Sequence, residues 1–124
     1  MKVKDLMIGD WFHNNYTNEN YQVWPTFLSQ ATNYGKRLNA TFEDINITPI
    51  PLTDEILKKN GFEYFHKNYA SLSYEHPFQL KMNEWPDENG LNGLWTIFDI
   101  IEIRFVHQLQ HALRLCGIDK EIKL

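Results

Sequence analysis

The sequence predicts an α+β fold: a small N-terminal antiparallel barrel or curled sheet, a short helix, an antiparallel sheet and a C-terminal helix packed on it. Three observations support this. Short apolar or alternating segments joined by polar turns fill most of the chain. A helix with start and stop signals stands near the middle. An apolar run at 97–103 leads into a stretch whose apolar residues recur every three or four positions.

Length and composition predict one continuous domain over 1–124. The chain has 124 residues, 43% of them hydrophobic and 15% aromatic, which is enough to bury a core without disulfides or metals. We find no internal repeat, low-complexity segment or linker in the sequence.

Four short strands are predicted in the first fifty residues, joined by turns rich in Asn, Asp and Gly. The Gly9-Asp10 turn precedes the first strand, and polar residues 13–20 form a hairpin loop. The strands open at Trp11 and continue over 21–28, 38–42 and 45–50. This spacing is typical of a small barrel or curled sheet.

The central helix, predicted over 53–60, has a signal at each end. Thr53 is an N-cap residue, and Asp54 follows at the positive end of the helix dipole. Gly61 stands where a left-handed residue ends a helix, and Phe62 would supply the apolar contact of a Schellman motif.

The second half is predicted to form strands over 62–69, 70–74 and 78–82, a long turn over 85–93, and a buried strand over 97–103. The final helix carries one apolar stripe, which places the thiol of Cys116 in the core as an inert group. Its members are Phe105, Val106, Leu109, Ala112, Leu113 and Cys116. Gly117 should end this helix, and 118–124 alternates like a last short strand.

Charge and motifs exclude several classes of function. The formal charge of −4 disfavours a protein that grips duplex phosphates over a broad face. The single cysteine excludes an internal disulfide. No phosphate-binding loop or nucleophile elbow is present, so we predict no catalytic residue and no cofactor. Without a signal peptide or a membrane-spanning run, we expect a cytoplasmic protein that contacts no membrane.

A histidine pair, His107 and His111, has the four-residue spacing that places two imidazoles on one helical face. Metalloprotease helices share this spacing, but Gln108 stands where they carry the glutamate that acts as general base. The pair projects away from the apolar stripe, into water or under a neighbouring element. We predict that it hydrogen-bonds a loop or a partner together with Gln108 and Gln110, and that it holds no metal.

The alternative interpretation of this pair is the site of a metal-dependent hydrolase or nuclease. His107 and His111 would then act with an acid such as Asp99 or Glu102.

Aromatic residues are more numerous than a small core usually needs, with four Trp, six Tyr and eight Phe. Trp85 and Trp95 are therefore candidate binding residues for a peptide, a base or a sugar. The alternative is that such residues fill an irregular core.

Three segments carry a resemblance to a family: Asp5-Leu-Met-Ile-Gly-Asp-Trp11, Pro49-Ile-Pro-Leu-Thr-Asp-Glu-Ile-Leu-Lys-Lys-Asn-Gly-Phe62, and Ile103-Arg-Phe-Val-His-Gln-Leu-Gln-His-Ala-Leu113. The chain resembles short uncharacterised proteins of gut anaerobic bacteria, often associated with prophages or mobile elements. The first segment is similar to the opening strand of an SH3-like barrel, so the resemblance implies that the N-terminal part of the chain forms an SH3-like partial β-barrel. The resemblance implies an accessory protein of a phage or integrated element, and it carries no substrate or catalytic residue.

Together these observations predict a non-enzymatic accessory binding module that contacts a protein or nucleic-acid partner, and they leave its oligomeric state open. The metal-dependent hydrolase or nuclease that uses His107 and His111 is the alternative.

Overall fold

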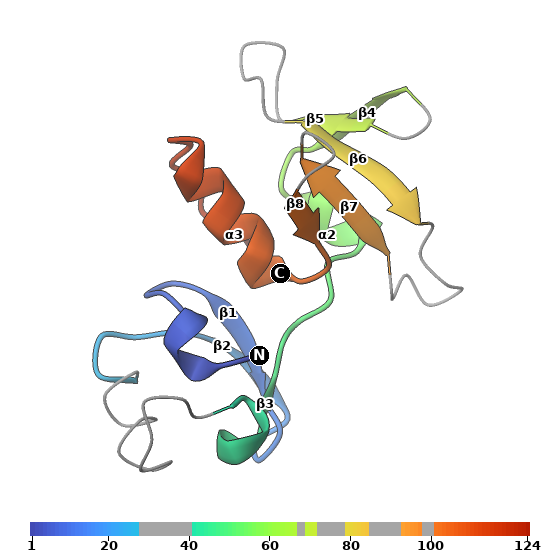
Figure 1. Cartoon of the computed structure of the whole chain (residues 1–124). Helices are drawn as coiled ribbons and strands as arrows, with labels where there is room; N and C mark the ends of the chain where they lie inside the picture. The colour runs from blue at the N-terminus through green and yellow to red at the C-terminus, as the bar shows by residue number, and fades with distance from the viewer. Residues whose placement is uncertain (28–40, 67–68, 72–78, 85–92, 98–100) are drawn as a thin grey trace. The chain divides into compact units, whose positions relative to one another are not determined.

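The fold is α+β, as predicted (Figure 1). The computed structural model describes residues 1–27, 41–66, 69–71, 79–84, 93–97 and 101–124. The chain divides into two compact units, Met1–Ile50 and Pro51–Leu124. This division does not test whether residues 1–124 form a single domain, which stays a prediction.

The first unit contains a three-stranded antiparallel sheet in the order β2-β1-β3. Its elements are η1 (Val3–Asp5), β1 (Trp11–Asn14), β2 (Glu19–Gln22), η2 (Glu43–Ile45) and β3 (Ile47–Thr48). Within the described residues this sheet does not close into a barrel, and its likeness to an SH3 domain stays a prediction.

The predicted hairpin joins β1 to β2, with strands that extend further into the polar segment than expected. The side chain of Asn14 starts the turn, because its Oδ1 accepts a hydrogen bond from the backbone N–H of Tyr16 at 2.8 Å. Asn18 ends it in the left-handed conformation, with φ of 56°. The imidazole of His13 lies between the side-chain oxygens of Asn18 and Asn20, at 3.1 and 2.7 Å from its two nitrogens.

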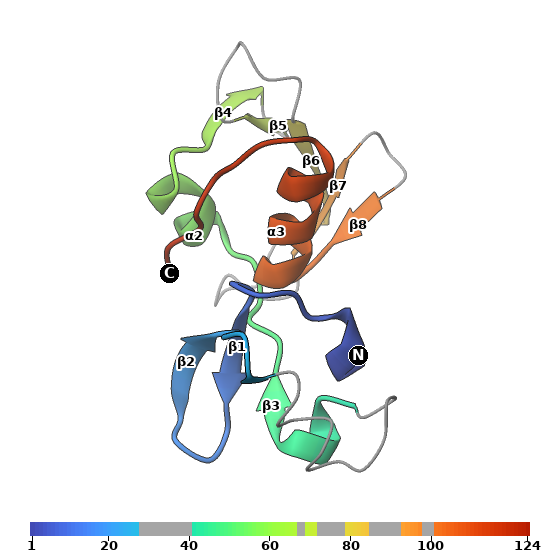
Figure 2. The ribbon, with the colours of Figure 1, turned by 90° about the vertical axis from the view of Figure 1, so that its left-hand side faces the viewer.

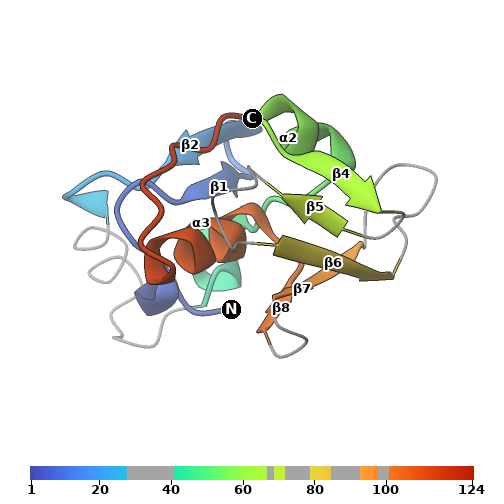
Figure 3. The same ribbon diagram turned by 90° about the horizontal axis from the view of Figure 1, so that it is seen from above.

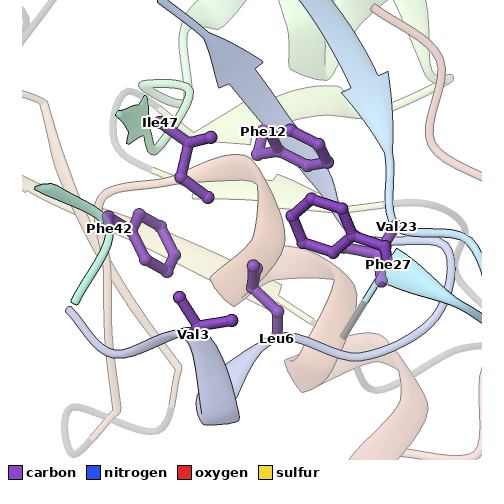
Figure 4. Packing of buried hydrophobic residues seen from close by; sticks show 7 residues of the cluster. All are labelled: Val3, Leu6, Phe12, Val23, Phe27, Phe42 and Ile47. Atoms are coloured by element: carbon purple, nitrogen blue, oxygen red, sulfur yellow. The ribbon is translucent and has the colours of Figure 1, made fainter. Parts of the chain in front are cut away.

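The core of the first unit gathers side chains from the sheet and from the segments around it (Figure 4). The ring of Phe12 stacks on that of Phe27 with a centroid distance of 4.7 Å. The buried members are Val3, Leu6, Phe12, Val23, Phe27, Phe42 and Ile47.

The prediction of a strand over 38–42 is wrong at residues 41 and 42, the part of this range that the structure describes. Thr41 makes only an isolated bridge to Lys2, and the chain then enters η2. Thr41 and Asp44 exchange two hydrogen bonds, from Thr41 N–H to Asp44 Oδ2 at 2.8 Å and from Asp44 N–H to Thr41 Oγ1 at 3.2 Å. This reciprocal pair is the arrangement of a capping box, so it favours a helical turn.

The second unit contains a five-stranded antiparallel sheet in which every strand pairs with its neighbour in sequence. Its strands are β4 (Glu63–His66), β5 (Tyr69–Ser71), β6 (Gln79–Glu84), β7 (Leu94–Ile97) and β8 (Ile101–Ile103). The helix α3 (Val106–Leu115) follows β8 and lies on one face of this sheet (Figures 1 and 2).

The single strand predicted over 97–103 is wrong, because the structure has two strands there. β7 and β8 pair antiparallel, with Trp95 opposite Ile103 and Ile97 opposite Ile101. The apolar sequence is nearly continuous across both strands, so it gave no sign of two elements.

The helix α2 (Asp54–Lys59) confirms each predicted end signal. The hydroxyl of Thr53 accepts a hydrogen bond from the Ile56 N–H at 3.3 Å. At the other end, Gly61 has φ of 86°. The Gly61 and Phe62 N–H groups donate to the carbonyls of Lys58 and Leu57, and these two bonds define a Schellman motif.

The helix α3 ends in a second Schellman motif at the predicted glycine. Gly117 has φ of 71°, and the carbonyls of Arg114 and Leu113 accept from the N–H groups of Gly117 and Ile118. Cys116, predicted to be buried, is exposed, because the buried part of the helix ends before it.

After α3 the chain passes to the end of α2 and remains there (Figures 2 and 3). This segment, 118–124, forms no strand of its own, although its alternation correctly indicated one inward side chain, Ile122.

Candidate functional site

Gln108, a predicted binding residue, caps the first turn of α3. Its Oε1 accepts hydrogen bonds from the backbone N–H groups of Arg104, at 2.8 Å, and Phe105, at 3.1 Å. These groups stand at a helix start, where backbone donors lack partners within the helix. The side-chain oxygen is thereby engaged with its own backbone.

The other three candidate residues of α3 are less exposed than the predicted polar surface would require. His107 and Gln110 are buried, and His111 is half-buried. The His107 ring stacks on Phe105 at a centroid distance of 6.1 Å and meets the His111 ring edge-on at 5.7 Å. Of the two placements expected for the imidazoles, His107 has the covered one.

The structure brings the two imidazoles together without completing a metal site in the described ranges. No group of three His, Cys, Asp or Glu residues that could hold a metal ion occurs there. Of the two proposed acids, Glu102 is exposed on β8, and Asp99 lies outside the described residues. A histidine pair alone supplies two of the four ligands of a closed zinc site.

The two candidate tryptophans have different outcomes. Trp95 is wholly buried in β7, where it pairs with Met82 on one side and Ile103 on the other. The prediction that Trp95 is a surface binding residue is therefore wrong, because its ring is buried in the core. Trp85 lies outside the described residues.

Near Trp95, the hydroxyl of Tyr64 donates a hydrogen bond to Asp54 Oδ1 at the start of α2. Burial raises the pKa of Tyr64 well above its usual value, and the hydrogen bond to Asp54 and the negative charge of that carboxylate raise it further. The indole N–H of Trp95 acts in the opposite direction and lowers this pKa, although it forms no hydrogen bond with a described residue.

This raised pKa predicts a loss of stability in alkali. The unfolded tyrosine ionises near pH ~10, whereas the folded one holds its proton to higher pH. Its contribution is therefore complete below pH ~10 and is lost as the pH rises through the folded pKa. We expect Tyr64→Phe to reduce the alkaline fall in the urea midpoint, measured from neutral pH to about pH 11. Tyr16→Phe, at an exposed tyrosine, is the control, and an equal slope in all three proteins would contradict the assignment.

The predicted turn at Gly9-Asp10 has a feature that sequence reasoning missed, because it exposes apolar side chains. The Asp10 N–H donates to the Met7 carbonyl at 3.0 Å, and Gly9 has φ of 91°, as a type II turn requires. The buried carboxylate of Asp10 accepts from the Met7 N–H at 2.7 Å. The turn leaves Ile8 59% exposed and Met7 47% exposed.

Backbone pairing joins this turn to the segment that carries Trp24. The Gly9 N–H donates to the Val23 carbonyl, and the Val23 N–H donates to the Asp10 carbonyl, both at 2.8 Å. The Trp24 ring packs edge-on against Phe27 at 4.8 Å, yet 41% of the residue is exposed. Met7, Ile8 and Trp24 together are called the Trp24 patch below.

The sequence signals the turn but not the patch. Gly9 and Asp10 are both typical turn residues, and they predicted the turn itself. Which apolar residues stay exposed depends on distant packing, and no local pattern gives that.

Comparisons with family models, curated proteins and solved structures give no match to this chain. Among the described residues, no helix has the length and apolar character needed to cross a bilayer.

Proposed function

We propose that this chain is a non-enzymatic binding module that contacts a protein partner through the Trp24 patch, as an accessory protein of a phage or mobile element. The observation that carries the binding role is the patch itself: Met7 and Ile8 are exposed on a turn that a buried carboxylate holds in place, and Trp24 is exposed on the segment paired with that turn. The resemblance in three sequence segments supports the accessory role.

The patch has the physical character of an interface core. Tryptophan and methionine are enriched at protein interfaces, and tryptophan is among the residues that contribute most to binding. Trp24 keeps one edge against Phe27, so little freedom of its ring remains to be lost on binding. A net charge of −4 favours a protein partner over nucleic acid.

The test places a photo-crosslinking amino acid at position 8 and, as a control, at position 115, which is also an exposed apolar position. We expect position 8 to capture a defined protein from native host cells and position 115 not to capture it. With the purified partner, Ile8→Ser should weaken binding about tenfold or more, and Leu115→Ser should leave it unchanged.

Two results would contradict the proposal. Equal binding by wild type and Ile8→Ser would remove the patch from the interface. A captured species that nuclease treatment abolishes would make the partner a nucleic acid. The hydrolase alternative at His107 and His111 stays a prediction that no observation of this structure favours.

A further inference from the structure

We propose that the end of α2 is a docking site for an extended peptide and that the chain's own tail, residues 118–124, occupies it. The partner that fits is an unstructured segment with one branched apolar residue followed by a residue bound through its main chain. This inference is independent of the Trp24 patch, which lies in the other unit.

The first argument is that the side chain of Asn60 binds the main chain of the tail. Its Nδ2 donates to the Lys123 carbonyl at 2.6 Å, and its Oδ1 accepts from the Lys123 N–H at 2.7 Å. Both main-chain groups of one residue are thus bound, as a neighbouring strand would bind them. Such recognition supplies affinity for any extended backbone, whatever the side chain at that position.

The second argument is that the helix holds Asn60 in position for this role. Nδ2 also donates to the Ile56 carbonyl at 2.8 Å. The backbone N–H of Asn60 donates to the carbonyls of Ile56 and Leu57 at the end of α2. The residue is only 4% exposed. This burial is that of the filled site, in which both hydrogen-bonding atoms of the amide have partners, as buried polar groups usually do. The backbone of another extended segment could satisfy the same two atoms in place of the tail.

The third argument is that the tail enters the fold through very few groups. Ile122 is 1% exposed, whereas Asp119, Lys120, Glu121 and Lys123 are exposed. The Lys59 ammonium adds a hydrogen bond to the main-chain oxygen of Leu124. One buried side chain and a few main-chain bonds are what a peptide from another molecule would also bring, so we expect the site to accept one.

The connection to α3 permits the exchange. The Schellman motif fixes the chain up to Ile118, and beyond it the described side chains are exposed until Ile122. The tail competes as a tethered ligand at high effective concentration, so a free peptide meets an occupied site. Weakening the tail should uncover it.

The test uses the full-length chain carrying Ile122→Ser and a fluorescent peptide of residues 118–124, blocked at both ends. We expect the variant to bind this peptide saturably at one site and to regain thermal stability with it. Wild type should bind about tenfold or more weakly, because its own tail competes. A peptide carrying the same Ile122→Ser change should not bind. If the variant is unfolded, Ile122→Val takes its place, with the recovery of its melting temperature by the peptide as the readout.

Three results would overturn the proposal. A folded variant that ignores the peptide at millimolar concentration would make the tail an inseparable part of the core. Equal binding of the altered peptide would place binding elsewhere. A wild-type dimer that the Ile122→Ser change abolishes would identify the occupant as the tail of a second copy.

Discussion

Leu109→Ala is expected to lower the free energy of unfolding by about 2–5 kcal/mol, because the Leu109 side chain is fully buried and its removal leaves a cavity. Leu115→Ala is the matched control, since the same change on the same helix affects a side chain that is 81% exposed. Urea denaturation followed by circular dichroism measures both. Similar small losses in the two variants would show that α3 contributes little to the core of its unit.

Phe12→Ala is expected to cost about 3–5 kcal/mol in the first unit, where the ring stacks on Phe27 and is fully buried. Tyr16→Ala, on the exposed turn of the same hairpin, should cost far less. An undiminished midpoint in Phe12→Ala would remove the cluster of Figure 4 from the stability of this unit.

The two variants together test the prediction of a single domain over 1–124. If both units unfold in one cooperative step, Phe12→Ala and Leu109→Ala should each shift the same transition. If the units are independent, calorimetry should show two transitions, and each variant should move only one of them.

The features predicted correctly are those that neighbouring residues determine. A threonine before two acids can bond to the free N–H groups of the first turn, which fixed the start of α2. Gly61 and Gly117 adopt the left-handed conformation at low cost, which fixed both helix ends. These helix ends are set by hydrogen bonds and backbone conformations of neighbouring residues, so they can be predicted from the local sequence.

The errors arise where the same local pattern suits two structures. The apolar residues from 94 to 103 serve one long strand as well as the antiparallel pair β7 and β8. Thr41 and Asp44 carry a capping signal that a strand assignment overlooked. Cys116 continued the helical spacing but is exposed at the helix end, where nothing in the periodicity marks the limit of burial.

The candidate site was harder to predict, because burial is a property of the whole fold. Helical spacing placed His107 and His111 on a polar face, yet His107 and Gln110 are buried. The cap formed by Gln108 was missed because the sequence has no Ser, Thr, Asp or Asn at the helix start to complete a familiar motif. The Trp24 patch was missed because exposed apolar residues resemble core residues in sequence.

The order of strands in the second unit has a consequence for how this unit folds. A sheet in which each strand pairs with the next is built from contacts between segments that are neighbours in sequence, and topologies rich in local contacts fold faster than those dominated by distant ones. The hydrogen bonds between Asn60 and Lys123 instead join residues 63 positions apart. Closing that distance costs more chain entropy than any turn within the sheet. We therefore expect the strands of the meander to pair before the tail binds to α2.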